Sequence, residues 1–584
     1  MRTLLQQTGD AELKLRSRAM ECVGHMIEAV GREQCEDAVR ESTAFALSGL
    51  QLGLPELREY TFGFFAQLGD VIGDELAPLL PALLPACVAA LESDETLEWR
   101  GGAKDDTLAA TLAKLHGDGE GDDDDDDDDD DDEDGRRGGT LSVRTALLDE
   151  KAAAAHCVGA CATATAGLFH PHLERCATAV LACADYFHED VRGASCRAIA
   201  QLVGACAAAE IAPIDQGAWV RGGAVDASLL PPLCRALCDR AMAALCDRLL
   251  TDEDKDVVAA AAEAVAGIGK VLGPPALSPY AERIAAAVAQ LLTQEHTCQE
   301  QERDEEAAPG LLLDEDEDHD TPIWEALTEI MIGMSRTLGA RWQIHFDKLL
   351  PHLTRYLNPS HPTGSTQAMA MAILAETVHQ LEGAAAIYVQ QLLPLALRCS
   401  ASEDATCRQN STFGLGVFGQ WGGAIAIAQM QPILSAIQAR LDPTKEDEGS
   451  VRDNAYGALS RLVLAHGAAL PLPSILPALL AALPLEEDPG ENAPALRALM
   501  KCTHGEGTRP LMAPHVPALL VAIARCVGTD ALEASVLDEA RQFVAWLHSQ
   551  GAAQLEGIVM AMKEEERAAL ASLRDANPTG RGFA

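Results

Sequence analysis

The sequence has few aromatic side chains and few cationic ones. Aromatic residues make up 4% of its 584 residues, while apolar residues make up 48%. A chain rich in alanine and leucine but poor in aromatic residues favours helices over a β-sandwich. Lys and Arg number 44 against 89 Asp and Glu, which gives a formal net charge of −45. Because this charge repels phosphate backbones, we expect no direct binding of nucleic acid.

Targeting and membrane signals are also missing from the sequence pattern. Residues 1–7 contain no apolar run of the kind that a signal peptide needs. Charged residues, prolines or polar residues interrupt each stretch long enough to cross a bilayer, which predicts no membrane partner. The 17 cysteines stand within apolar helical patterns, so we expect reduced thiols that act as small hydrophobic side chains.

The acidic residues gather in two runs. Residues 122–134 are thirteen consecutive acids, and residues 300–320 hold eleven more acids against the single Arg303. Self-repulsion predicts that both runs are extended loops. Two interpretations stay open: the runs keep the protein soluble, or they attract a basic partner through long-range steering that weakens as salt rises. Under the second interpretation, the representative contact residues in the first run are Asp122, Asp126 and Asp130.

A short pattern repeats along the chain: an apolar residue, a basic residue, and then a helix rich in small residues. Arg58 follows Arg16 by 42 residues, and Arg452 follows Arg408 by 44. Counted from the apolar residue, positions 0, 4, 7, 8 and 11 form one helical stripe of small and large apolar residues. A second apolar helix, often with a proline near its start, precedes each copy.

Two amphipathic helices per unit with this period are typical of HEAT or armadillo repeats. The predicted fold class is therefore all-α, a HEAT/armadillo-type α-solenoid, which is a right-handed superhelix of antiparallel helix pairs. We expect HEAT repeats over residues 1–116, 142–297 and 321–548. The segments between and after them are predicted to be acidic loops over 117–141 and 298–320, and a C-terminal helix and tail over 549–584.

The residues around the head of each second helix are the candidate functional positions. The basic residues at these heads are predicted to bond the neighbouring repeat and form a structural ladder: Arg58, Arg192, Arg408 and Arg452. The candidate cargo contacts on the inner wall are the acids Glu56, Glu59, Glu189, Asp190 and Asp453, with the amides Asn410 and Asn454. The alternative is that these acids and amides cap helices or bond between repeats.

Signals for catalysis are weak. The Gly414-x-Gly416-x-x-Gly419 spacing matches a dinucleotide-binding loop, but it falls within a predicted helix and no strand precedes it, so close helix packing is favoured. Cysteine pairs four residues apart lack the second ligand pair of a zinc site. No nucleophile elbow, metalloprotease helix or P-loop is present. We expect no enzyme activity, no cofactor and no metal.

Several segments resemble one family when they are taken together and in order. These are VRDNAYGALSRL at 451–462, RQNSTFGLGV at 408–417, LLDEK at 147–151, HEDVR at 188–192 and LPLEED at 483–488. The chain resembles the importin-beta family of nuclear transport receptors, the karyopherins. It is most similar to the C-terminal half of the importin-4 subgroup, which also carries acidic insertions.

This resemblance implies a receptor that carries basic cargo, such as histones or ribosomal proteins, between cytoplasm and nucleus. It also implies cargo release by Ran-GTP and contact with FG nucleoporins. We expect both contacts to be weakened if the first repeats of the family, which make much of that contact, are truly absent. The alternatives are a HEAT-repeat scaffold and an acidic histone chaperone without a transport role.

Overall fold

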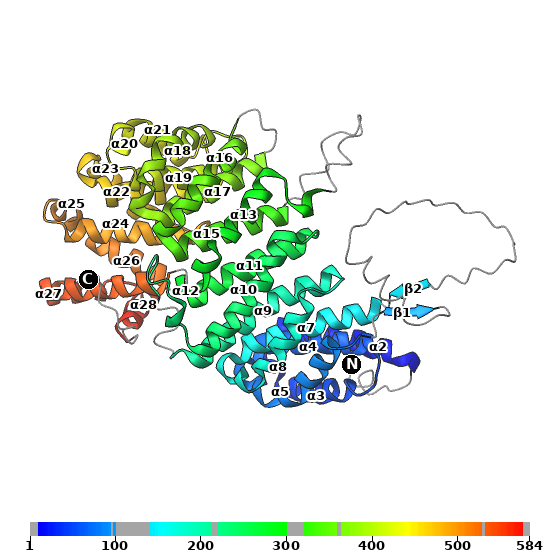
Figure 1. Ribbon diagram of the computed structural model, residues 1–584. Coiled ribbons are helices and arrows are strands. Elements are labelled where there is room, and N and C mark those ends of the chain that lie inside the picture. The colour runs from blue at the N-terminus through cyan, green and yellow to red at the C-terminus, as the bar shows by residue number, and fades with distance from the viewer. Residues whose placement is uncertain are drawn as a thin grey trace. The chain divides into compact units, whose positions relative to one another are not determined.

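The computed structural model describes residues 10–94, 97–100, 140–143, 145–212, 219–300, 321–358, 364–527 and 532–575. The chain divides into two compact units, residues 1–345 and 346–584. Each unit consists of helices stacked in pairs (Figure 1). The predicted all-α, HEAT-type fold is therefore confirmed, whereas the exact limits of the predicted segments stay predictions.

The first unit contains a row of second helices, each packed on the next, which we call the B row. The B row of this unit consists of α2 (Asp10–Val30), α4 (Pro55–Ile72), α7 (Thr145–Thr165), α9 (Glu189–Glu210), α11 (Lys255–Leu272) and α15 (Thr321–Leu338). Their partners are α3 (Arg32–Gly49), α5 (Leu80–Leu91), α8 (Leu173–Cys183), α10 (Pro232–Thr251) and α13 (Ala281–Thr293). Short helices at the turns are η1 (Gly73–Leu79), η2 (Ala166–His172), η3 (Ala227–Leu229), α12 (Pro274–Leu277), η4 (Ser278–Tyr280), η5 (Thr297–Gln299) and η6 (Gly339–Trp342).

The second unit repeats this arrangement. Its B row consists of α17 (Gly364–Leu381), α19 (Ala405–Trp421), α22 (Gly449–His466) and α24 (Asn492–His504). The helices that precede them are α16 (Gln343–Tyr356), α18 (Ala386–Cys399), α21 (Met430–Leu441) and α23 (Leu472–Ala482). The unit ends with α26 (Val516–Val527), the bent α27 (Ala534–Met560) and α28 (Glu564–Asp575). Its short elements are η7 (Glu382–Ala385), α20 (Gly423–Ala428), η8 (Gly467–Ala469), η9 (Pro489–Glu491), α25 (Arg509–Met512) and η10 (Ala513–His515).

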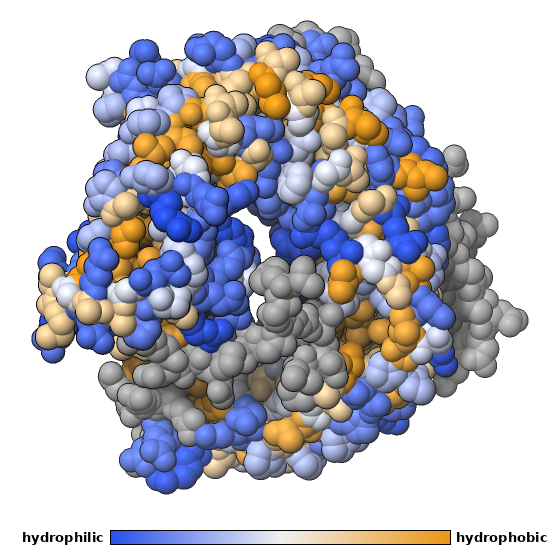
Figure 2. Space-filling view, turned by 90° about the vertical axis from the view of Figure 1, so that its left-hand side faces the viewer, coloured by the Kyte–Doolittle hydropathy of each residue, from blue (hydrophilic) through white to orange (hydrophobic). Residues whose placement is uncertain are grey.

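The repeating stripe lies in the core, as its spacing predicts. In α9, Val191, Ser195, Ile199 and Leu202 are all at most 1% exposed. The first copy of the pattern was assigned one residue out of frame. Leu15 is 52% exposed, whereas Arg16 is only 2% exposed and occupies the buried stripe. Apolar side chains that remain at the surface form separate patches among hydrophilic ones (Figure 2).

The glycine-rich segment of α19 serves helix packing, as predicted, and not a phosphate loop. A Cβ atom at Gly416 would lie 2.5 Å from the Cα atom of Ala458 in α22. One at Gly419 would lie 2.3 Å from a methyl group of Leu462. The two glycines therefore let α19 and α22 approach more closely than any side chain would allow.

One small element was not predicted. Strands β1 (Leu97–Arg100) and β2 (Thr140–Val143) pair in an antiparallel ribbon, with Leu97 opposite Val143 and Arg100 opposite Thr140. The ribbon brings together the two ends of residues 101–139. Such pairing joins residues about 40 positions apart in the sequence, so local periodicity gives no signal for it.

The sequence pattern predicts that no segment is apolar enough to span a bilayer. By length and composition this prediction is wrong. Three helical stretches are long and apolar enough to cross a membrane: Pro55–Leu91, Thr145–Cys183 and Arg509–Val527. Each of these stretches contains more than one helix of the stack. In the first stretch, for example, Leu80 and Leu83 of α5 are buried in the core. Pairs of core helices separated by short turns thus reproduce the hydropathy of a membrane span.

The cysteines pack in the core where the structure describes them. All the described cysteines except Cys22 are buried, and none of them forms a disulfide. Burial is the main cause that raises the pKa of Cys196 and Cys526 to about 12. No group of three or more metal-ligating side chains is arranged to hold a metal ion among the described residues.

Candidate functional site

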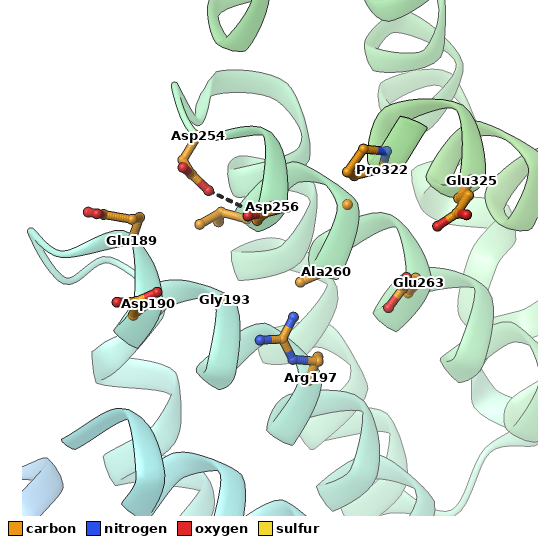
Figure 3. A pocket seen from close by; sticks show the side chains of 12 residues that line it. Glu189, Asp190, Gly193, Arg197, Asp254, Asp256, Ala260, Glu263, Pro322 and Glu325 are labelled. Carbon is orange, nitrogen blue, oxygen red and sulfur yellow. Dashed lines mark hydrogen bonds between the residues drawn. The ribbon is translucent and has the colours of Figure 1, made fainter. Parts of the chain in front are cut away.

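An acidic groove crosses three neighbouring B-row helices of the first unit. It has a volume of about 330 Å³ and is lined by residues of α9, α11 and α15 and by Asp254, which precedes α11. Six of the lining residues are acids: Glu189, Asp190, Asp254, Asp256, Glu263 and Glu325. Arg197 is the single cation among them, and its guanidinium points into the groove between the acids (Figure 3). The groove therefore carries a clear excess of negative charge.

Most of these acids lie at the starts of helices. Asp254 is the N-cap of α11, and its Oδ1 atom accepts the backbone N–H of Val257 at 2.9 Å. Glu189 and Asp190 lie in the first turn of α9, and Asp256 lies in the first turn of α11. Acids are favoured at these positions because they face the positive end of the helix dipole. Stacking the helices in register then aligns their acidic first turns along one edge.

The carboxylates of the groove remain accessible to solvent. The side chains of Glu189 and Asp190 are 50% and 69% exposed. Glu263 and Glu325 are exposed and lie beyond the first turns of their helices. Because these carboxylates are exposed, the groove can attract a cationic segment without disrupting a buried ion pair.

A second group of acids lies further along the same B row. Glu59 of α4 is half-buried, and this burial, followed by the charge of Asp149, raises the pKa of its carboxyl to about 7. Glu56 approaches Lys14 of α2 at 3.1 Å, and Arg18 of α2 lies over the Tyr60 ring. Cations of the neighbouring B-row helix α2 therefore lie close to this second group of acids.

The predicted amide contacts of the second unit point inward. Asn454 is 2% exposed, and its side-chain nitrogen donates to the Ser450 carbonyl and to a carboxylate oxygen of Asp488 at 2.9 and 2.7 Å. Both amide hydrogens are thus used inside the protein, which supports the alternative of a bond between repeats, and the role of Asn454 as a cargo contact stays a prediction. The Asn410 amide donates to the Ala368 carbonyl at 2.9 Å, which bonds α19 to α17.

Asp453 also bonds within the protein. Its Oδ2 atom accepts the backbone N–H groups of Glu487 and Asp488 at 2.9 and 3.0 Å. Burial, opposed by these hydrogen bonds, raises the pKa of its carboxyl. Asp453 thus fits the alternative of a bond between repeats. The remaining predicted contacts, Asp122, Asp126 and Asp130, lie outside the described residues.

The arginines of the predicted ladder share one geometry. Arg192, Arg408 and Arg452 each donate through a terminal nitrogen to the two carbonyls that lie six and five residues earlier, at 2.8 to 3.1 Å. Arg192 also binds Asp252 with two hydrogen bonds of 2.8 Å. Arg58 lies 3.2 Å from Glu150 of the next B-row helix. The carbonyl contacts of Arg192, Arg408 and Arg452 fix the turns that lead into the second helices, whereas the Arg58–Glu150 pair joins α4 to α7.

Arg408 completes the same geometry with a buried carboxylate. It binds both oxygens of Glu446 at 2.8 Å, and Arg440 binds one of them at 2.7 Å. Burial works to raise the pKa of the Glu446 carboxyl, but the hydrogen bond and charge of Arg408, followed by Arg440, hold the pKa below its usual value. Glu446 therefore stays ionised inside the stack.

Sequence reasoning found Glu189 and Asp190 but missed the other four acids of the groove. Asp254 and Asp256 precede Val257, in a copy of the repeat that has lost its basic residue and so looked degenerate. Aligning that copy by its small-residue helix would have found both. Glu263 and Glu325 carry no local signal, since only the stacking of α11 on α15 brings them to the groove.

The fold defines the class of this protein as a HEAT-type helical solenoid. No protein-family model matches the chain. Over 563 residues and 95% of its length it is 24% identical to the probable importin subunit beta-4 of Schizosaccharomyces pombe, covering 51% of that protein. Over 82% of its length it is 28% identical to importin-4 of Homo sapiens, covering 43% of it.

Solved structures agree on the architecture. The chain aligns with Kap121p bound to RanGTP with a TM-score of 0.64 and 15% identity, over 98% of this chain and 53% of that one. The chain thus spans about half the length of the relatives it matches. The predicted resemblance to the importin-beta family, in its importin-4-like C-terminal half, is confirmed.

Proposed function

We propose that this chain is the cargo-binding part of a nuclear import receptor that shuttles between cytoplasm and nucleus. Its cargo would be basic proteins such as histones or ribosomal proteins. The observation that carries the proposal is the acidic groove, in which six carboxylates face a single guanidinium. Support also comes from the relatives, which are named as importins, and from Kap121p, whose structures include complexes with RanGTP and with Nup53p.

The groove suits an extended segment rich in Lys and Arg. Its carboxylates come from three successive repeats, so a chain lying across the B-row helices would meet acids at several points. Long-range attraction would raise the rate of encounter, and the individual contacts would be weak but numerous. In the whole receptor, Ran-GTP would release cargo by favouring a conformation with poorer contacts.

The test is a salt titration with a labelled histone-tail peptide. We expect the dissociation constant to rise by at least about tenfold between 50 and 300 mM salt, since the Debye length falls over this range. Deleting residues 122–134 should weaken binding further if that acidic run also captures cargo. An affinity that ignores ionic strength would contradict the proposal.

Transport has to be separated from histone-chaperone activity, because an acidic groove would serve both. Import of a fluorescent basic cargo into permeabilised cells, with the chain supplied as the receptor or as part of a full-length relative, distinguishes them. A chaperone would bind the cargo without increasing its nuclear accumulation. A general scaffold would keep its partners after residues 122–134 are deleted.

A further inference from the structure

The second unit contains a pocket of a different character. It has a volume of about 330 Å³ and lies between α25, η10 and the start of α26 on one side and α27 on the other. Helix α27 departs from helical geometry at Gly551, so that residues on both sides of this bend line the pocket. Most of its lining is apolar, with Pro514, Pro517, Leu555 and Ile558 among the contributors. Its size and composition match sites that bind a small ligand or a large side chain.

An aromatic cluster fixes the wall of this pocket. The ring of Trp546 lies 4.1 Å from the ring of His504 and stacks on Phe543 at 5.9 Å. The guanidinium of Arg509 lies over the same indole at 5.5 Å. Because Trp546 is held by contacts on several sides, the pocket exists before any ligand arrives, which lowers the entropic cost of binding.

Arg509 gives the pocket its charge. It is the single charged residue of the lining, in a protein with twice as many acids as bases. Its Nε atom and one terminal nitrogen donate to the carbonyls of Thr503 and His504, six and five residues earlier. Arg192 and Arg408 also bond the carbonyls six and five residues earlier, but each does so through one terminal nitrogen and binds a carboxylate through Nε and the other terminal nitrogen. In Arg509 the remaining terminal nitrogen has no such hydrogen bond among the described residues.

Arg509 lacks that carboxylate. Within the part of the chain that the structure describes, no ion pair joins it to an acid, and its side chain is exposed at the pocket. Arg452 shares the two-carbonyl geometry without an acid as well, but it lines neither pocket. Arg509 thus has a guanidinium of the kind that Arg192 and Arg408 pair with an acid. In addition, an apolar cavity lies beside it.

We propose that this pocket binds a short segment of another protein in which one large apolar side chain stands next to an acidic residue. The apolar side chain enters between Trp546 and Ile558, and the carboxylate pairs with Arg509. A basic neighbour would instead be repelled, so the pocket selects ligands opposite in charge to those of the acidic groove. The two sites can therefore be occupied independently, and this proposal does not rest on the proposed import function.

The test uses three fluorescein-labelled peptides and the full chain. Their Gly/Ser backbone carries a central Asp-Phe-Asp, Lys-Phe-Lys or Asp-Ala-Asp sequence. We expect the first to bind in the micromolar range and the other two to bind at least about tenfold more weakly, since each lacks one of the two contacts. Fluorescence anisotropy of the labelled peptide measures the affinity.

Variants assign the binding to the pocket. Ala513→Trp fills the cavity from an exposed lining position and should abolish binding of the Asp-Phe-Asp peptide. Arg509→Gln should weaken it by about tenfold. Lys501→Gln removes an equal charge from an exposed residue of α24 outside the lining and should leave it unchanged. Thermal unfolding of each variant verifies that it is folded.

Three outcomes would overturn the proposal. The first is equal binding of the Lys-Phe-Lys peptide that is lost in the Ala513→Trp protein, which would show that the pocket recognises only the apolar side chain. The second is unchanged binding by a folded Ala513→Trp protein, which would place the site elsewhere. The third is that the Asp-Phe-Asp peptide does not bind at concentrations up to about 1 mM, because a functional site should bind its ligand more tightly than that. Occupation of the pocket by another segment of this chain would give the same result.

Discussion

The acidic groove makes a quantitative prediction that can be tested with two substitutions. Glu263 and Glu325 are suitable targets because both are exposed, both line the groove, and neither caps a helix. Replacing both with glutamine keeps their size and polarity but removes two of the six negative charges. Asp254 is a poorer target, since its loss would also remove the N-cap of α11.

The expected effect follows from what exposed ion pairs contribute. Each is worth about 0.2–1 kcal/mol, so two lost pairs should weaken binding of a basic peptide by about 0.4–2 kcal/mol. At 1.4 kcal/mol for each factor of ten, the dissociation constant should rise by roughly 2- to 30-fold. The difference should shrink near 0.5 M salt, where the Debye length is only about 4 Å.

Fluorescence anisotropy with a Lys/Arg-rich peptide at several salt concentrations measures this effect. The matched control is Asp74→Asn with Asp239→Asn, which removes the same charge from exposed positions in η1 and α10 outside the groove. If the control weakens binding as much as Glu263→Gln with Glu325→Gln, the peptide responds to net charge and not to the groove. If neither pair has any effect at low salt, the groove is not the binding site.

Two further predictions concern single carboxylates. Glu446→Gln should lower the free energy of unfolding by about 3 kcal/mol or more in a urea titration, because it leaves Arg408 and Arg440 without their buried partner. The control, Glu448→Gln at an exposed position, should change the free energy of unfolding by less than about 0.5 kcal/mol. Equal effects of the two substitutions would show that the ladder pair is not stabilising. Since the pKa of Glu59 is raised from 4.5 to about 7, its proton stabilises the folded state, and this stabilisation is lost as pH rises from about 4.5 through 7. The unfolding temperature of Glu59→Gln should therefore exceed that of the unchanged protein above pH 7, and the two should converge below about pH 4.5; a constant difference would contradict the raised pKa.

The repeat architecture could be predicted from the sequence because its signals are local. The helical stripe that contains Val191 and Ser195 recurs within each copy, and each copy is long enough to define its own period. Ladder positions such as Arg192 followed from the same alignment. Two of the six groove acids, Glu189 and Asp190, were found in this way because they lie three and two residues before that arginine.

What could not be predicted depends on contacts between residues distant in the sequence. Asp252, the partner of Arg192, lies 60 residues further on, and a spacing that varies from repeat to repeat does not identify it. The same limit applies to the segment before η3. There the Trp219 indole donates to the Lys270 carbonyl at 3.0 Å, and Gly222 donates to the Thr337 carbonyl, which ties the ends of α11 and α15 together.

The negative charge of the groove is a consequence of how the repeats are built. The arginines at the helix heads are used in the turns, where Arg192 and Arg408 each satisfy two carbonyls and one buried carboxylate. Acids at the same helix starts are favoured by the helix dipole and remain exposed. The repeat of α9 therefore uses Arg192 in its turn and displays Glu189 and Asp190, and stacking α11 beside it adds Asp256 along the same edge. If the groove binds basic proteins as proposed, substitutions at the first turns should alter stability and affinity together, whereas those at Glu263 and Glu325 should alter affinity alone.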